Sequence, residues 1–185
     1  MANGQNVDRI SQWFESMETE HPRLLQVSKA TRFREVVNSC QPFRNIIAAL
    51  SQPDDANAMV VVDPDGALRR QFLHEITKIG CCVTLERYFR KGIDVNLTDD
   101  HDVTALHLAA EYGNYEDMKV LLDNGAKIKP DWRGLNPLHI VASVIKPRSK
   151  IAELLIQYME QQQKEGLQVY TTCKNKRTDS KARGR

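Results

Sequence analysis

The chain has 185 residues and a formal net charge of +2, with 41% hydrophobic and 27% charged residues, a composition typical of a globular domain. No apolar run approaches the roughly 20 residues that a membrane-spanning helix needs, and the N-terminus has neither the cationic start nor the apolar stretch of a secretory signal. Four cysteines are too few and too scattered for a disulfide framework. We therefore expect an intracellular, cytoplasmic protein without a membrane partner.

Residues 1–66 are predicted to form a helical N-terminal cap followed by a loop. The first apolar residues recur at helical spacing and so share one face of a short helix. They are Ile10, Trp13, Phe14 and Met17. Two or three further helices are expected over residues 23–52, where they would cover the open end of a repeat array. The turn signal Asp63-Pro64-Asp65-Gly66 closes this region.

Three histidines recur at a nearly constant spacing in the second half of the chain. The steps are 33 residues from His74 to His107 and 32 residues from His107 to His139, which is the range of a stacked structural repeat. Glycines keep the same step, as from Gly80 to Gly113. An array of this kind buries its core between neighbouring units and presents an extended concave surface. The spacing therefore predicts a solenoid that binds a partner.

The middle unit shows most clearly how each repeat is built. Thr104 is a suitable N-cap for a helix that begins near Ala105, and Gly113 is a suitable residue to end it in a left-handed conformation. A second helix is predicted over residues 115–123, with Asn124-Gly125 after it. Each unit is therefore expected to contain two antiparallel helices and a turn.

These segments resemble the ankyrin repeat family. Residues 104–110 match its Thr-Pro-Leu-His-x-Ala-Ala signature with alanine in place of proline, and residues 136–139 keep the proline but replace the threonine. The resemblance implies an all-α ankyrin solenoid with units at about 67–98, 99–130 and 131–160. In the first unit Gln71 replaces the capping threonine, so its turn is expected to be irregular.

The recurring histidines are predicted to be part of the scaffold. Metal ligands or catalytic bases would have to converge on one point, whereas residues placed one per unit stand about 10 Å apart along a helix stack. Hydrogen bonds to backbone or hydroxyl groups near each turn are the expected role, which the resemblance also implies. Because no triad, phosphate loop or paired-acid site is evident, we expect no enzyme, no cofactor and no metal.

In a stack of this kind the turn tips and the first helix of each unit line the concave side. Exposed tryptophan and arginine dominate interface energies, although Trp132 can instead pack against a neighbouring turn. The acidic tip around Asp100 is either a solvated turn or a surface that steers a basic partner segment. The predicted partner-binding residues are Asp100, His101, Asp102, Glu111, Tyr112, Trp132, Arg133 and Ser143.

The segment Phe72–Gly80 is also similar to the Phe-His-Glu-Ile-Ala start of small viral ankyrin proteins of parasitoid wasps. Those proteins are regarded as truncated relatives of the NF-κB inhibitors. The resemblance implies binding of a Rel-type transcription factor and suppression of host immune signalling. The 185 residues contain no Asp-Ser-Gly-x-x-Ser phosphodegron, which fits such an inhibitor, whereas the basic C-terminus does not. The alternative is an adaptor that recruits another protein through residues 1–52. A monomer is expected in either case.

Residues 161–185 are predicted to form a polar helix extension, similar to a C-terminal cap, and then a disordered basic tail. The segment 174–185 holds six basic residues and one acidic residue. Solubility, nuclear import and nonspecific nucleic-acid contact are all compatible with such a tail. Because no aromatic residue follows Tyr170, base stacking is not supported, and a nucleic-acid partner is not expected.

Overall fold

The computed structural model describes residues 11–16, 19, 27–50, 66–144 and 148–179. The all-α prediction is confirmed, because these ranges contain helices and turns but no β-strand beyond one isolated bridge between Thr98 and Thr104. The helices are α2 (Val27–Ser39), α3 (Gln41–Leu50), α5 (Ala67–Ile79), α6 (Cys82–Arg90), α7 (Ala105–Tyr112), α8 (Tyr115–Asp123), α9 (Pro137–Ser143) and α10 (Ser149–Asp179). Among the described residues, no helix is both long and apolar enough to cross a membrane.

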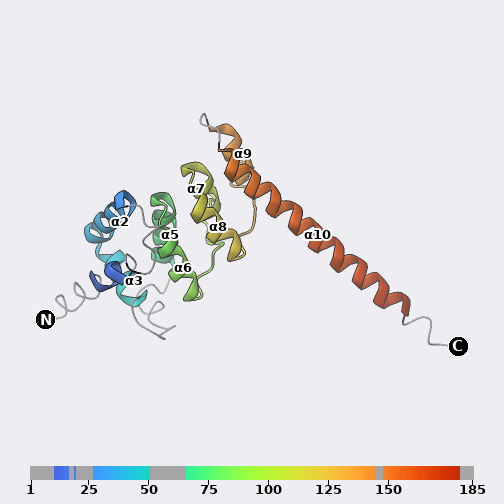
Figure 1. The fold of residues 1–185 in the computed structure, drawn as a ribbon, viewed down its shortest axis with the longest axis horizontal. Helices are drawn as coiled ribbons and strands as arrows, with labels where there is room; N and C mark the ends of the chain where they lie inside the picture. The colour runs from blue at the N-terminus through green and yellow to red at the C-terminus, as the bar shows by residue number, and fades with distance from the viewer. Residues whose placement is uncertain (1–10, 17–18, 20–26, 51–65, 145–147, 180–185) are drawn as a thin grey trace.

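Helices α5 to α10 form three consecutive antiparallel pairs that stack side by side (Figure 1). The first helices of the pairs contact one another, α5 with α7 and α7 with α9, and the second helices do the same, α6 with α8 and α8 with α10. Two layers of helices result, with the apolar core between them. One pair lies in each predicted unit, whereas the boundaries between the units remain a prediction.

The middle unit folds as its sequence predicts. Helix α7 begins directly after Thr104, and α8 spans residues 115–123. Gly113 ends α7 with φ 76°, and its amide donates a hydrogen bond to the Ala109 carbonyl. Because only glycine adopts this left-handed conformation at little cost, the residue allows the chain to reverse into α8.

The first unit has no turn tip of the kind that the other two units have. Helix α5 has 13 residues against eight in α7, and it begins at Ala67, so that Gln71 lies inside the helix and not before it. The segment Leu68-Arg69-Arg70-Gln71 contains only good helix formers. The irregularity expected at Gln71 is therefore an additional helical turn.

The N-terminal helices cover the first face of the stack. Helices α2 and α3 both contact α5, and the rings of Phe33 and Phe43 lie 6.2 and 5.3 Å from the ring of Phe72. Trp13 and Phe14, on a short helical segment at residues 11–16, are buried in the same core. The other two residues of that predicted apolar face, Ile10 and Met17, lie outside the described residues.

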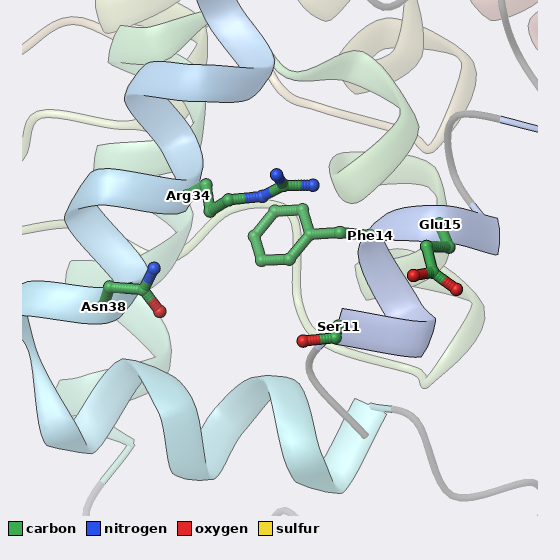
Figure 2. A pocket seen from close by; sticks show the side chains of 5 residues that line it. All are labelled: Ser11, Phe14, Glu15, Arg34 and Asn38. Atoms are coloured by element: carbon green, nitrogen blue, oxygen red, sulfur yellow. The ribbon is translucent and has the colours of Figure 1, made fainter. Parts of the chain in front are cut away.

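A small hollow lies between that short segment and α2 (Figure 2). The Phe14 ring points towards the Arg34 guanidinium, whose central carbon lies 4.8 Å from the ring centroid. Ser11, Glu15 and Asn38 complete the lining of a volume of about 180 Å³. A hollow of this size has room for several water molecules.

Helix α10 has 31 residues and extends away from the array (Figure 1). It continues to Asp179 and so includes residues 174–179, which are expected from composition to be disordered. No proline follows Pro147, and the segment is rich in glutamine, glutamate and lysine, so nothing in it stops a helix except the mild cost of Gly166.

Candidate functional site

The turn between the first and second units, residues 99–104, is organised by one carboxylate. Asp99 Oδ1 accepts hydrogen bonds from the backbone amides of His101 and Val103, each at 2.9 Å. The Thr98–Thr104 bridge closes the loop, and Asp102 takes a left-handed conformation with φ 55°. Aspartate is one of the few residues that form such turns readily.

The turn between the second and third units, residues 131–136, repeats this design. Asp131 Oδ1 accepts from the amides of Arg133 and Leu135, each at 2.9 Å. Asp131 Oδ2 accepts from Arg133 Nε at 3.0 Å and from Arg133 Nη2 at 2.8 Å. The Arg133 side chain is therefore held by its own turn, although half of it stays exposed.

The two turns, called the tip turns below, are joined to each other. The Trp132 amide donates to the His101 carbonyl at 3.1 Å, and the two rings lie 5.8 Å apart at an angle of 56°. Trp132 nevertheless keeps 64% of its surface exposed. One side of the tryptophan ring thus contacts the neighbouring turn, and most of the ring faces solvent.

The predicted partner-binding residues fall into two groups. Those on the tip turns lie together, with Asp100 almost fully exposed and 3.9 Å from Arg70, and with His101 and Asp102 also exposed. The others, Glu111, Tyr112 and Ser143, are exposed at the far ends of α7 and α9. Eight helical residues separate the two groups by about 12 Å along α7.

His107 and His139 make the hydrogen bonds near the turns that the scaffold role predicts. His107 is 1% exposed; its Nδ1 accepts from the Thr104 amide at 3.1 Å, and its Nε2 lies 3.2 Å from the Leu135 carbonyl. These contacts require the Nε2–H tautomer, and burial lowers the pKa of this imidazole. His139 Nδ1 accepts from the Asn136 amide. Among the described residues, His74 Nε2 in the first unit is buried without a hydrogen-bond partner, although the following tip turn is formed.

Two residues that the sequence analysis did not single out connect adjacent units. Asn114 Nδ2 donates to the Thr77 carbonyl at 2.6 Å, at the end of α5. Arg148 Nη1 donates to the carbonyls of Ala110 and Glu111, at the end of α7. Each donor comes from the following unit and satisfies carbonyls that a helix leaves unpaired at its C-terminus. Among the described residues, no three histidine, cysteine or acidic side chains lie close enough to hold a metal ion.

Gly80→Ala is expected to destabilise the protein by about 2 kcal/mol or more, and Gly125→Ala by only about 1 kcal/mol. Both glycines have a positive φ, 82° and 83°. A Cβ at residue 80 would lie 2.6 Å from Asn114 Oδ1, whereas a Cβ at residue 125 meets no atom within 4 Å. Urea unfolding of both variants measures the difference, and equal losses would show that the close approach of Asn114 carries no energy.

The stacked helix pairs and hydrogen-bonded tip turns define a class of repeat protein. A family model described as ankyrin repeats in three copies matches residues 73–166. The match covers half of the chain, and the chain therefore belongs to the ankyrin repeat family. Repeats of this family form protein-binding modules, and this is the function that the fold supports directly.

Three curated relatives illustrate the similarity. Human inversin is 37% identical over 109 residues, which are 55% of this chain and 10% of that protein. Chicken inversin is 41% identical over 75 residues, 40% of this chain and 7% of that protein. A Caenorhabditis elegans homolog of the transient receptor potential cation channel subfamily A member 1 is 31% identical over 109 residues, 58% of this chain and 9% of that protein. The chain thus spans about a tenth of the length of these relatives.

Proposed function

We propose that the chain binds a protein partner through the two tip turns, with Trp132 as the main contact. The observation that carries this proposal is the tryptophan itself, which is 64% exposed although its backbone is hydrogen-bonded to the neighbouring turn. A large ring on a backbone held in this way loses little conformational entropy when a partner covers it. The His101 ring lies beside the tryptophan ring, and the side chain of the next residue, Arg133, is half exposed; both would supply polar contacts to a partner.

The partner that we propose is a Rel-type transcription factor, which the chain would inhibit in the manner of an NF-κB inhibitor. Two sequence features support this choice: the resemblance of Phe72–Gly80 to the viral ankyrin proteins, and the absence of a phosphodegron in the 185 residues. The exposed carboxylates of Asp100 and Asp102 on the first tip turn would attract a basic segment of such a factor and speed its association. Suppression of host immune signalling is the corresponding biological role.

Trp132→Ala is expected to weaken binding to a purified Rel-type factor by at least about tenfold. The substitution removes the exposed ring and leaves the amide of residue 132 bonded to His101. Titration calorimetry with the parent and the variant measures the loss. Tyr115→Ala is the matched control, because Tyr115 is also an exposed aromatic residue but lies on α8, outside the tip turns. Equal affinities of parent and Trp132→Ala would refute the tip-turn surface.

The same comparison separates the inhibitor from the adaptor that contacts its partner through the N-terminal helices. Affinity capture with the parent chain can retain a protein other than a Rel-type factor. If the Trp132→Ala variant no longer captures that protein, the tip-turn surface is supported and the choice of a Rel-type partner is wrong. If capture persists with Trp132→Ala but is lost when exposed residues of α2 are changed, such as Arg32→Glu, the adaptor hypothesis is supported instead.

A further inference from the structure

A short amphipathic segment near the N-terminus inserts two adjacent aromatic side chains into the body of the protein. Residues 11–16 are helical, and Trp13 and Phe14 are 4% and 2% exposed. The other four residues of the segment are exposed or partly exposed. One of them, Ser16, donates a hydrogen bond from Oγ to the Trp13 carbonyl at 2.8 Å, within the segment itself. The two rings therefore supply the apolar contact of the segment with the rest of the chain.

The site that receives these rings is built by residues of α2 and α6. Phe33 on α2 is 1% exposed, and its ring centroid lies 5.8 Å from that of Trp13 and 5.6 Å from that of Phe14. A guanidinium lies over each ring, where it is attracted to the aromatic face. The central carbon of Arg34 is 4.8 Å from the Phe14 centroid, and that of Arg87 is 5.5 Å from the Trp13 centroid. We call the site formed by Phe33, Arg34 and Arg87 the aromatic site, and Figure 2 shows Arg34 and Phe14 within it.

The segment fits the aromatic site incompletely. In the described part of the chain, the indole Nε1 of Trp13 is buried without a hydrogen-bond partner, which costs free energy that a phenylalanine would not lose. The hollow of about 180 Å³ adjoins the Phe14 ring, so there is room for a larger side chain beside it. A different helix with phenylalanine in place of the tryptophan, or with a side chain in the hollow, would therefore fit the site better.

We propose that the aromatic site binds an amphipathic helix of a protein partner, and that residues 11–16 occupy this site in the free protein. The recognised feature is a pair of adjacent aromatic side chains, because the site already holds such a pair between two arginines. Insertion of the apolar face of a helix is a common form of peptide recognition. The aromatic site shares no residue with the tip turns, so it is a second binding site, independent of the first.

The N-terminal segment competes with such a partner. An occupant on the same chain has a high effective concentration, so the partner must displace it and binds more weakly than it would bind an empty site. The segment is therefore an autoinhibitory contact for the aromatic site.

The double substitution Trp13→Ala and Phe14→Ala in the full chain tests this competition. The probe is a labelled synthetic peptide of residues 9–19 with phenylalanine at the position of Trp13, and fluorescence anisotropy measures its binding. The double variant is expected to bind this peptide at least about tenfold more tightly than the parent chain, because its own segment no longer competes. Circular dichroism checks that the variant is folded. A folded variant that does not bind the peptide, or that binds it no better than the parent, would overturn the proposal.

Arg87→Ala in the double variant locates the peptide. Loss of the guanidinium that covers the ring at position 13 should weaken peptide binding by about threefold. Arg90→Ala is the matched control, because Arg90 lies three residues further along α6, is largely exposed and pairs with Glu86 at 3.9 Å. Equal affinities after both substitutions would place the peptide outside the aromatic site and contradict the proposal.

A further measurement keeps the N-terminal segment intact. The chain has two tryptophans, so Trp132→Phe leaves Trp13 as the only one. Unlabelled probe peptide, which contains no tryptophan, should displace the segment, and quenching of the Trp13 fluorescence by acrylamide should then rise with peptide concentration and saturate. If Trp13 stays shielded from acrylamide at all peptide concentrations, the segment is a permanent part of the core and the proposal is wrong.

Discussion

Asp117→Asn is expected to stabilise the protein, and the gain should grow by roughly 2 kcal/mol between about pH 6.5 and about pH 8.5. Asp117 lies in the first turn of α8 and is 1% exposed, and neither of its carboxylate oxygens has a hydrogen-bond partner in the part of the chain that the structure describes. Burial raises its pKa to about 8, against the opposing charge of Lys29 and with a further increase from Glu116. The folded protein therefore holds Asp117 mainly as a neutral carboxylic acid below about pH 8, and ionising it in the fold costs free energy.

The direction of the effect follows from the number of protons bound. The folded protein keeps the Asp117 proton up to about pH 8, whereas the unfolded chain has lost it above about pH 4. The free energy of unfolding therefore falls as the pH rises from about 4 to about 8, and it levels off above that. Asparagine cannot ionise, so the variant should lose this slope.

Other buried groups leave this pH window clear. Burial lowers the pKa of His74 and of His107, so those side chains affect stability below about pH 6.5, where acid destabilises the fold. Burial raises the pKa of the Cys81 thiol and raises that of Cys82 to about 12. These thiols lower the free energy of unfolding only as the pH rises through their unfolded pKa of about 9, at the upper edge of the window, and they do so in parent and variant alike. Urea unfolding at several pH values measures the slope.

Glu116→Gln is the matched control for the Asp117 experiment. It removes the same charge one residue earlier, from an exposed side chain, and should leave the pH dependence nearly unchanged because exposed charges contribute little. If the unfolding free energies of Asp117→Asn and of the parent run parallel from pH 6.5 to 8.5, then the buried carboxylate is not the titrating group.

His107→Ala is expected to lower the free energy of unfolding by about 3 kcal/mol, and His139→Ala by less than about 1 kcal/mol. His107 is buried and connects Thr104, at the start of α7, with the Leu135 carbonyl of the next tip turn. Its removal leaves a cavity and unpaired polar groups on both sides. His139 occupies the equivalent position in the third unit, but it is exposed, so water can replace its bond to the Asn136 amide.

Thermal and urea unfolding of these two histidine variants provide the measurement. The same side chain is truncated at the same position of the repeat, so the difference between the two values reports burial and the bond to the next unit. Similar losses in both variants would contradict a linking role for His107 and would indicate that each histidine stabilises only its own turn.

The sequence predicts the middle unit well because its signals are local. Thr104, Gly113 and Gly125 fix where helices begin and end by backbone geometry alone, and the observed bounds of α7 and α8 agree with them. The repeat spacing likewise predicts which residues lie on the tip turns, whereas their partner-binding role remains a prediction. For α5 the sequence predicts only an irregular turn at Gln71. Without an N-cap residue, helix propensity alone does not define the first residue of a helix.

The features that the sequence analysis missed depend on contacts between units. Nothing local marks Asn114 as the donor to Thr77, or Arg148 as the donor to Ala110, since each bond joins residues more than 30 positions apart. The sequence around Asp117 does not indicate its burial either. An aspartate in the first turn of a helix usually faces water, where its charge interacts favourably with the helix dipole. Its burial depends on the packing of α8 against α6, which the local sequence does not show.

The bonds made by Asn114 and Arg148 also bear on how the chain is completed during synthesis. In each pair the later residue emerges from the ribosome after the helix that it serves, so α5 has unpaired carbonyls until Asn114 arrives and α7 until Arg148 arrives. A unit of this array is thus finished by its successor. The gaps between helix pairs are therefore poor points at which to divide the protein. A fragment that ends at Asn124, after the second pair, would leave the Ala110 and Glu111 carbonyls without Arg148.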